Sequence, residues 1–448
     1  MIVDLPRPLS IGKITDLVQG KVDPSQRSAM ITKLCTDSRE AMAGILFIAL
    51  MGKNGSGEDH IDNAIAHGAI GLSTRSQTKC ITVDDTLIAL HRLAGGILED
   101  KKIPLRIAIT GSVGKTTTKN LLSHLITDSI QVYSSRGNHN NLLGMPLTLL
   151  EAPYKTQAII CEMGMNSQGE IGFMSRLLHP THGVITNIGR AHIGMLGSRE
   201  KIAEAKLEIL EGMSGGPVFI PYSEPLLCGP KYGRTVSLGQ EGDYRLKRCD
   251  SSYSFIHPSG VIEGLIPPSE DISDLECLSF ALAVSTSLGI EGEEIMTRVR
   301  SIPPSCFRRR VIELSDFTVI DDSYNASPES MIAGFKSLRK YTNRPIILCL
   351  GDMLELGDQA IELHREMGRL AENLHPYAVY LIGRYAPDFN DGLGGIGSVI
   401  GEDADYKDIG REILSSLPTG AVIYLKASHA IGLDKLAGIL ERSGKNSE

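Results

Sequence analysis

The sequence predicts an α/β protein of three domains, and three observations lead to this fold class. A chain of 448 residues is long enough for about three domains of ordinary size. In two parts of the chain, short apolar runs alternate with helical segments, the pattern of parallel sheets covered by helices. One such run leads through a glycine-rich loop into a helix, at Arg106–Thr117. We expect the domains to cover residues 1–101, 102–304 and 305–448, with a linker at Lys101-Lys102-Ile103-Pro104.

The composition is that of a folded globular protein, with 42% hydrophobic and 22% charged residues. A formal net charge of −8 argues against nucleic acid as a general partner. No apolar run is long enough to span a membrane, and the first residues show no signal peptide. The eight cysteines are scattered without a Cys-x-x-Cys pair, which indicates free thiols rather than disulfides or a zinc site. We therefore expect a cytoplasmic protein that does not insert into membranes.

The first unit contains two polar segments that suit a phosphorylated ligand. A strand is expected at Gly44–Leu50 and a short helix at Ile61–His67. Asp37-Ser38-Arg39 follows an apolar stretch, and Gly52–Asp59 is a glycine-rich polar loop. Both segments suit a phosphorylated or nucleotide-like ligand and ordinary surface turns equally well, so the residues alone leave the choice open.

The stretch Thr110–Thr117 has the features of a phosphate-binding loop. The apolar run Leu105–Ile109 predicts a buried strand before it, and a helix is expected from Lys119 to about Thr127. Glycines let the backbone approach phosphate oxygens, and the N–H groups at the start of the helix face the anion. The lysine can reach the β- and γ-phosphates, and the threonine after it can bind Mg²⁺. Ile109 stands where the general pattern has glycine, so the loop is a shortened form. Its residues are Gly111, Ser112, Val113, Gly114, Lys115, Thr116 and Thr117.

Three apolar runs of the second unit predict buried parallel strands: Leu105–Ile109, Ala158–Cys161 and Gly183–Ile185. The phosphate loop, Glu162 and Asn187 follow their carboxyl ends. Because ligands bind beyond the carboxyl ends of strands in open α/β sheets, we expect both side chains near the phosphates. Glu162 either holds Mg²⁺ or is a solvated loop carboxylate.

The rest of the second unit is expected to hold helices at Arg199–Leu210 and Asp274–Leu288, with an irregular β-rich region at 214–270 between them. His192 lies in the loop after the third strand, where the residues alone favour a structural role over metal ligation. Lys206 lies on the first of these helices, and a lone helical lysine indicates a solvated surface charge.

Four apolar runs predict a second sheet of the βαβ type in the third unit. Asp321–Pro328 follows the first of them; its last two residues suit the start of a helix, and its paired aspartates remain for a ligand. The loops Gly351–Gly357 and Lys426–His429 either close a cleft or are plain surface loops. The expected strands are Thr318–Asp322, Pro345–Gly351, Ala378–Gly383 and Ala421–Lys426, with helices at Ser330–Tyr341 and Gln359–Asn373.

Several longer motifs, which follow one another along all three units in the family's order, resemble the Mur ligase family. The shortened phosphate loop is one of them. The Asp-Asp-x-Tyr-Asn-Ala-x-Pro stretch at Asp321–Pro328 is similar to the branch that adds D-alanyl-D-alanine rather than to its sister ligases. The other matching stretches are Gly137–Leu150, Glu162–Gly164 with Gly169–Ile171, Thr186–His192, Ala205–Ile209 and Gly351–Gly357 with His364.

The resemblance implies a fold and an activity. The fold has a small N-terminal α/β UDP-binding domain, a central P-loop ATPase-type parallel-sheet domain, and a C-terminal Rossmann-like domain that closes over ATP and binds the incoming dipeptide. The implied enzyme is an ATP-dependent, ADP-forming ligase that joins D-Ala-D-Ala to UDP-N-acetylmuramoyl-tripeptide through an acyl phosphate, giving the pentapeptide precursor of peptidoglycan. ATP and two Mg²⁺ are the implied cofactors, and we expect a monomer.

The resemblance also implies roles for single residues. Thr116 and Glu162 hold one Mg²⁺, and His192 helps to hold a second, which a carbamylated Lys206 can bind or orient. The catalytic positions are matched by Lys115, Lys206, His192 and Arg308. The UDP-substrate contacts are matched by Ser38, Arg39 and Asn140. The implied ATP contacts are the loop residues Gly111–Thr117 with Asn138, Asn187, Asp322, Tyr324 and Asn325.

The chain departs from the family's pattern in two segments near the expected nucleotide. His429 stands where the family has an arginine after Lys426-Ala427-Ser428. Asp274–Cys277 replaces a histidine and an asparagine that lie near adenine, so no adenine contact is assigned.

Two other functions remain as alternatives. One is a related ligase that adds a single amino acid to a muramoyl or folate acceptor, against which the Asp321–Pro328 motif argues. The other is a nucleotide-driven switch without ligation, which would leave the motifs of the third unit unexplained.

Overall fold

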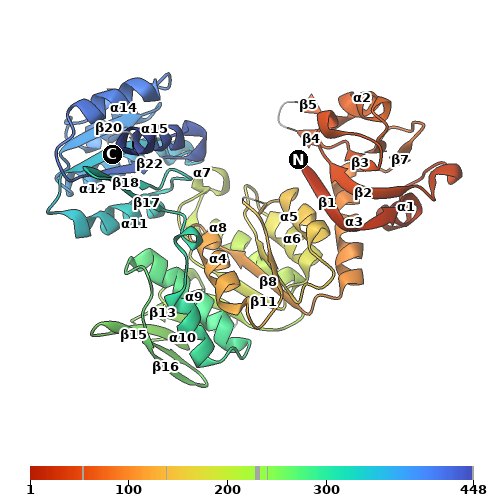
Figure 1. Ribbon diagram of the computed structural model, residues 1–448, viewed down its shortest axis with the longest axis horizontal. Coiled ribbons are helices and arrows are strands. Elements are labelled where there is room, and N and C mark those ends of the chain that lie inside the picture. The colour runs from red at the N-terminus through yellow and green to blue at the C-terminus, as the bar shows by residue number, and fades with distance from the viewer. Residues whose placement is uncertain (53–54, 138, 228–232, 240, 446–448) are drawn as a thin grey trace.

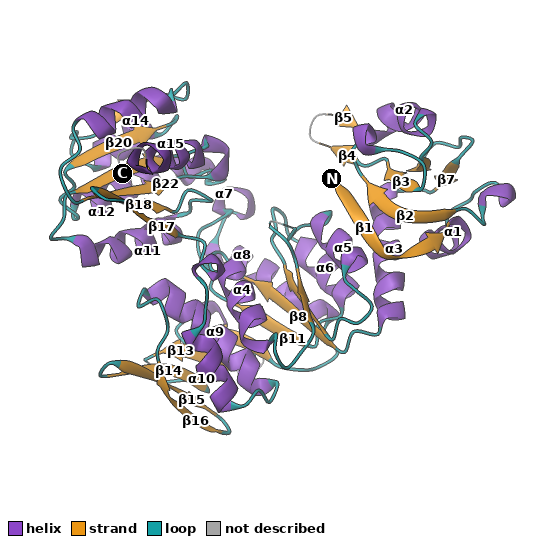
Figure 2. Ribbon diagram, viewed as in Figure 1, coloured by secondary structure: helices purple, strands orange, loops and turns teal. Residues whose placement is uncertain are grey.

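The computed structural model describes residues 1–52, 55–137, 139–227, 233–239 and 241–445. Within these residues, the strands form sheets of five, nine and six strands and one two-stranded hairpin. Figures 1 and 2 show the nine-stranded unit between the other two, with helices packed against each sheet. This arrangement confirms the α/β fold class. None of the described helices is long and apolar enough to cross a bilayer, and the described cysteines are free thiols.

The first sheet has the order β1-β2-β3-β6-β7, antiparallel between β1 and β2 and parallel elsewhere. Strand β3 (Ile45–Ile48) and helix α2 (Ile61–Ala66) confirm the two elements predicted here. Ser10 and Asp85 cap the helices α1 and α3 through their side chains. The other elements are β1 (Ile2–Ser10), α1 (Ile11–Val18), β2 (Met30–Cys35), β4 (Met51–Gly52), β5 (Gly55–Ser56), β6 (Ile70–Ser73), β7 (Cys80–Thr82) and α3 (Thr86–Lys101).

The helix α3 leads from the first unit to the second and ends at Lys101, so of the predicted linker only residues 102–104 lie between this helix and the next strand. Lys101 is the last residue of this helix, and its side chain is buried. Its ammonium group donates to the carbonyls of Leu149 and Leu150 at 2.6 and 2.9 Å. These carbonyls belong to the last turn of α5 (Gly144–Glu151), where backbone acceptors lack partners within the helix. The first unit is therefore fastened directly to the second.

The central sheet has the order β16-β15-β14-β13-β12-β11-β8-β10-β9. The strands β8 (Leu105–Thr110), β10 (Ala158–Glu162) and β11 (His182–Ile185) are parallel neighbours, which confirms the three predicted strands. Both faces of β8 lie in apolar clusters, as expected for a central parallel strand. The pairs β14–β15 and β15–β16 are antiparallel and lie in the region predicted to be β-rich. The other elements are α4 (Lys115–Ile126), β9 (Val132–Ser134), α6 (Glu170–Leu178), α7 (Ile193–Leu196), α8 (Arg199–Leu207), β12 (Val218–Pro221), β13 (Arg234–Leu238), β14 (Tyr244–Cys249), β15 (Ser252–His257), β16 (Gly260–Leu265), α9 (Ile272–Ser287) and α10 (Gly292–Arg300).

The third sheet has the order β17-β18-β22-β19-β20-β21, parallel except for β17 at one edge. The four predicted strands are present as β18 (Phe317–Asp321), β19 (Ile346–Gly351), β20 (Ala378–Ile382) and β22 (Ala421–Lys426). The edge strands β17 (Arg310–Glu313) and β21 (Ser398–Ile400) were not predicted, because they are short and mostly exposed. The helices are α11 (Pro328–Leu338), α12 (Ala360–Glu372), α13 (Ala386–Gly392), α14 (Tyr406–Ser415) and α15 (Asp434–Lys445).

Candidate active site

A cleft of about 620 Å³ lies between the middle and C-terminal units, where the strands β8 and β11 end. The phosphate loop forms one wall, and the loops that follow β18, β19 and β22 form the other. Leu354 and Glu355 line the cleft, as do Lys426, Ser428 and His429. The Gly351–Gly357 and Lys426–His429 loops are therefore parts of a cleft rather than plain surface loops.

The phosphate loop has a backbone that its two glycines make possible. Gly111 and Gly114 have φ angles of 145° and 85°, values that side-chain-bearing residues rarely adopt. A Cβ atom on Gly111 would lie 1.9 Å from the hydroxyl oxygen of Thr186. Lys115, the first residue of α4, donates from Nζ to the Gly111 carbonyl at 2.6 Å. Burial lowers the pKa of Lys115 to about 8.

Asn187 holds the phosphate loop in shape. Its Oδ1 accepts from the backbone N–H groups of Ser112 and Val113, both at 3.0 Å. Its Nδ2 donates to the Val113 carbonyl at 3.1 Å, and the Thr186 hydroxyl donates to the same carbonyl at 2.6 Å. The expected position of Asn187 beside the phosphates thus takes the form of direct contact with the loop backbone.

Thr116 and Glu162, the expected Mg²⁺ ligands, lie together. The Thr116 hydroxyl donates to the Glu162 carboxylate at 2.9 Å. The alternative of a solvated Glu162 is wrong, because this side chain is fully buried and pairs with Lys119 at 3.0 Å. Sequence reasoning missed Lys119, although its place four residues after Lys115 puts both lysines on one face of α4.

Lys206 is buried, with only 1% of its surface exposed, so the interpretation as a surface charge was wrong. Burial and the nearby charge of Lys115 hold the pKa of Lys206 well below its usual value. Its local sequence on α8 gives no sign of this environment, and only the resemblance selected it.

His192 and Glu355 face each other across the two units, with His192 Nδ1 2.7 Å from the Glu355 carboxylate. Both have positive φ angles, 67° and 66°, which are uncommon for such residues and often mark functional sites. Within the described ranges, no group of three or more His, Cys, Asp or Glu side chains is arranged to hold a metal ion. Glu162 and His192 are therefore not part of one cluster made from these residue types.

The start of the C-terminal unit reaches into the middle unit. Arg308 donates to the Thr116 hydroxyl, and its guanidinium lies 4.0 Å from the ring centroid of Tyr324. Arg309 instead pairs with Asp271 at 2.8 Å, at the start of α9. Of these two arginines, Arg308 is the one directed to the phosphate loop.

The other ATP positions taken from the resemblance also line the cleft. Tyr324 stacks on His429 with their ring centroids 5.6 Å apart, and Asn325 lies beside it. The Asp322 carboxylate accepts from the Tyr424 hydroxyl and pairs with Lys426, both at 2.9 Å. Asp322 is thus held by two side chains of the neighbouring strand β22.

The expected UDP-substrate residues lie in two places. Asn140 lines the cleft, and its carbonyl accepts from the Gly164 N–H at 2.6 Å. Ser38 and Arg39 lie in the first unit, on a short 3₁₀ helix after β2, outside this cleft. Asp37 caps that helix and pairs with the exposed Arg39 side chain at 2.5 Å. Asn138 lies outside the described residues.

The fold and the cleft define a class of protein: a three-sheet α/β chain with a phosphate-binding loop in its middle unit and a C-terminal unit that completes the same site. Two family models match the chain, the Mur ligase middle domain at residues 109–248 and the Mur ligase glutamate ligase domain at residues 308–429.

Full-length relatives agree with these matches. The UDP-N-acetylmuramoyl-tripeptide–D-alanyl-D-alanine ligase of Bacillus subtilis is 32% identical, with 95% of this chain and 97% of that protein covered. A crystal structure of MurF from Acinetobacter baumannii superposes with a TM-score of 0.87 at 26% identity, covering 98% of this chain and 100% of the other. MurF from Thermotoga maritima in complex with ADP gives 0.79 at 25% identity, covering 97% and 100%. The chain belongs to the Mur ligase family.

Replacing Asn187 with alanine tests how the phosphate loop is held. We expect Asn187→Ala to lower the affinity for ATP about tenfold, because two loop N–H groups lose their acceptor and the loop loses its shape. Isothermal titration of ATP in the presence of Mg²⁺ measures this change. Asn373→Ala, which changes an exposed asparagine at the C-terminal end of α12 that does not line the cleft, serves as the control. An unchanged affinity in Asn187→Ala would refute this role.

Proposed function

We propose that this chain joins D-Ala-D-Ala to UDP-N-acetylmuramoyl-tripeptide with ATP, forming the pentapeptide precursor of peptidoglycan in the cytoplasm, and that it acts as a monomer. The observation that carries the proposal is the cleft in which the phosphate loop faces the loop Asp321–Pro328 of the C-terminal unit. The Bacillus subtilis relative, which bears the name of this activity and matches nearly end to end, supports it.

The reaction has two steps. A carboxylate oxygen of the tripeptide attacks the γ-phosphorus of ATP, the bond to the β-phosphate oxygen breaks, and ADP leaves. The acyl phosphate then takes the dipeptide amine at its carbonyl carbon, the amine loses a proton, and phosphate leaves with the former carboxylate oxygen. A carboxylate oxygen is a poor leaving group, and phosphorylation makes it a good one.

The first step brings two anions together, and the cleft supplies positive charge where they meet. Lys115 lies at the start of α4 and Arg308 contacts the next residue, Thr116. Because solvent screens charges less inside a cleft than in bulk water, these charges offset the repulsion more strongly there.

Mur ligases depend on Mg²⁺, and the oxygen donors present here suit it. Thr116 and Glu162 offer a hydroxyl and a carboxylate within hydrogen-bond distance of each other. We propose that they hold one Mg²⁺, which supplies charge stabilisation to the transferring phosphoryl group. His192 helps to hold a second.

We propose that Lys206 is carbamylated. Its lowered pKa favours the neutral amine, which is the form that attacks carbon dioxide and then loses a proton to give the carbamate. The carbamate replaces a buried cation next to Lys115 with an anion that can orient a cation.

In this proposal each of the three units binds a different part of the substrates. The first unit, with Ser38 and Arg39, binds the UDP end of the acceptor. The middle unit binds ATP, a role that the resemblance also gives to Asn138, and it binds the acceptor substrate through Asn140. The C-terminal unit binds the dipeptide and contributes Asp322, Tyr324 and Asn325 to the nucleotide site.

The direct test is phosphate release with each component left out in turn. We expect the purified protein to release phosphate from ATP only with Mg²⁺, UDP-muramoyl tripeptide and D-Ala-D-Ala together, and Lys115→Ala to abolish release. Single amino acids in place of D-Ala-D-Ala check the related ligases. Release without an acceptor, or equal use of a single amino acid, would contradict the proposal.

Lys206→Ala tests the carbamate. We expect its ligase rate to fall about a hundredfold and to recover in part when formate or acetate is added, because a short carboxylate can replace the carbamate. Lys201→Ala, on the exposed face of the same helix, is the matched control and should keep full activity. Full activity of Lys206→Ala would reject the role.

A further inference from the structure

The loop of residues 187–192 contacts the nucleotide site on one side. Its first residue, Asn187, accepts from two N–H groups of the phosphate loop. Two residues further on, the Gly189 N–H donates to the Ser112 hydroxyl at 2.8 Å. This loop is therefore hydrogen-bonded directly to the segment that is expected to bind phosphate.

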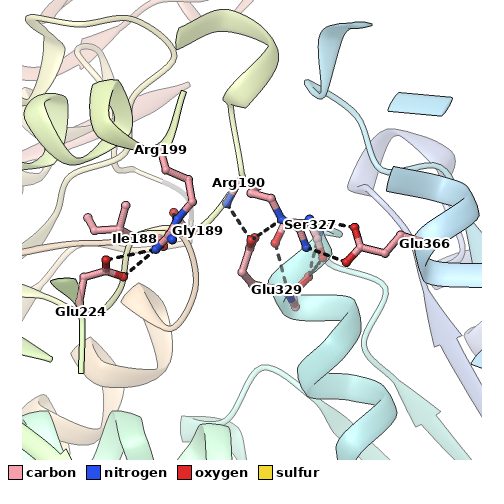
Figure 3. Close-up of polar contacts among 10 residues, drawn as sticks. Ile188, Gly189, Arg190, Arg199, Glu224, Ser327, Glu329 and Glu366 are labelled. Carbon is pink, nitrogen blue, oxygen red and sulfur yellow. Dashed lines mark hydrogen bonds and ion pairs between the residues drawn. The ribbon is translucent and has the colours of Figure 1, made fainter. Parts of the chain in front are cut away.

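The next residue of the same loop contacts the C-terminal unit. The Arg190 backbone N–H and Nε both donate to Glu329 Oε1, at 2.8 and 3.2 Å. Its terminal nitrogens donate to the two carboxylate oxygens of Glu366, at 2.8 and 3.3 Å. Figure 3 shows the guanidinium lying between the two carboxylates, whereas the nearby Arg199 pairs with Glu224 inside the middle unit. Arg190 is therefore a cation of one unit shared by two acids of another.

The two acids lie on elements that hold them in place. Glu329 is in the first turn of α11, which begins with a capping box between Ser327 and Ser330. Glu366 lies on α12, which packs against α11. The side chains of Arg190, Glu329 and Glu366 are 25, 27 and 35% exposed, so these pairs are only partly screened by solvent.

The glycines around this contact permit a close approach of the two units. A Cβ atom on Gly189 would lie 2.7 Å from the carboxylate carbon of Glu329. A Cβ atom on Gly194, in α7, would lie 2.2 Å from the backbone nitrogen of Gly357. The absence of side chains at these two glycines thus lets the two units approach each other closely.

We propose that Arg190 is a positioning residue whose ion pairs with Glu329 and Glu366 hold the C-terminal unit on the phosphate loop. In this arrangement Arg308 reaches Thr116, and Glu355 lies against His192. The 187–192 loop links the nucleotide site to the C-terminal unit, because it contacts the phosphate loop through Asn187 and the C-terminal unit through Arg190. The kinetic consequences rest on the proposed function, whereas the docking of the units does not.

The test compares Glu366→Gln with Glu362→Gln. Both lie on α12, but Glu362 is exposed and pairs only with Arg369 of the same helix among the described ion pairs. We expect Glu366→Gln to raise the KM for D-Ala-D-Ala about fivefold, as for the loss of one partly buried ion pair. The KM for UDP-muramoyl tripeptide, whose UDP end is assigned to the first unit, should stay within the error of wild type.

Small-angle scattering with a non-hydrolysable ATP analogue measures docking without catalysis. We expect a larger radius of gyration for Glu366→Gln than for Glu362→Gln. The difference should become smaller in about 0.5 M salt, where the screening length falls to about 4 Å, but should persist in part because the pairs are partly buried. Arg190→Gln already removes the cation that both acids share. Adding Glu366→Gln to it should therefore not increase the radius of gyration further.

Two outcomes overturn the proposal: identical scattering and KM values for the two glutamine variants, or a lower KM in Glu366→Gln. A wild-type protein without ligase activity would refute the proposed function instead, and the scattering comparison would still decide whether Arg190 holds the units together.

Discussion

Parallel strands end on the same edge of a sheet, and in the central sheet this edge brings together groups that are far apart in the sequence. The phosphate loop follows β8, Glu162 ends β10, and Asn187 follows β11. Because the three strands are hydrogen-bonded neighbours, their ends meet without any special loop geometry. The C-terminal unit then needs only to be placed against this edge to complete the cleft.

Lys115, Lys119 and Lys206 lie near this edge, beside the carboxylate of Glu162. Lys119 pairs with Glu162, whereas burial lowers the pKa of Lys115 to about 8, and burial together with the nearby charge of Lys115 holds the pKa of Lys206 well below its usual value. Burial of a charge without a partner is costly. A bound triphosphate offsets that cost, so the site is stabilised by the ligand that it is proposed to bind, and carbamylation of Lys206 would act in the same direction.

The sequence was sufficient for the parts of the fold that depend on local pattern. Buried parallel strands are apolar on both faces, so β8, β10 and β11 were visible as apolar runs, and the glycine loop was visible from its residues. Lys206 was not visible, because the same local sequence suits a surface helix and a buried one. The docking of Lys101 was missed for a similar reason: it depends on carbonyls of a helix almost fifty residues away. Arg190 was unremarkable in the sequence, since its partners come from another unit.

The proposed function depends on one chemical step, in which the acceptor carboxylate is activated by direct attack on the γ-phosphorus of ATP. The most direct measurement is to label the terminal carboxylate of UDP-muramoyl tripeptide with ¹⁸O and to analyse the released phosphate by mass spectrometry. We expect one ¹⁸O atom from the carboxylate in each phosphate, because that oxygen leaves with the phosphoryl group. Phosphate without carboxylate ¹⁸O, released while ligation proceeds at its normal rate, would contradict it.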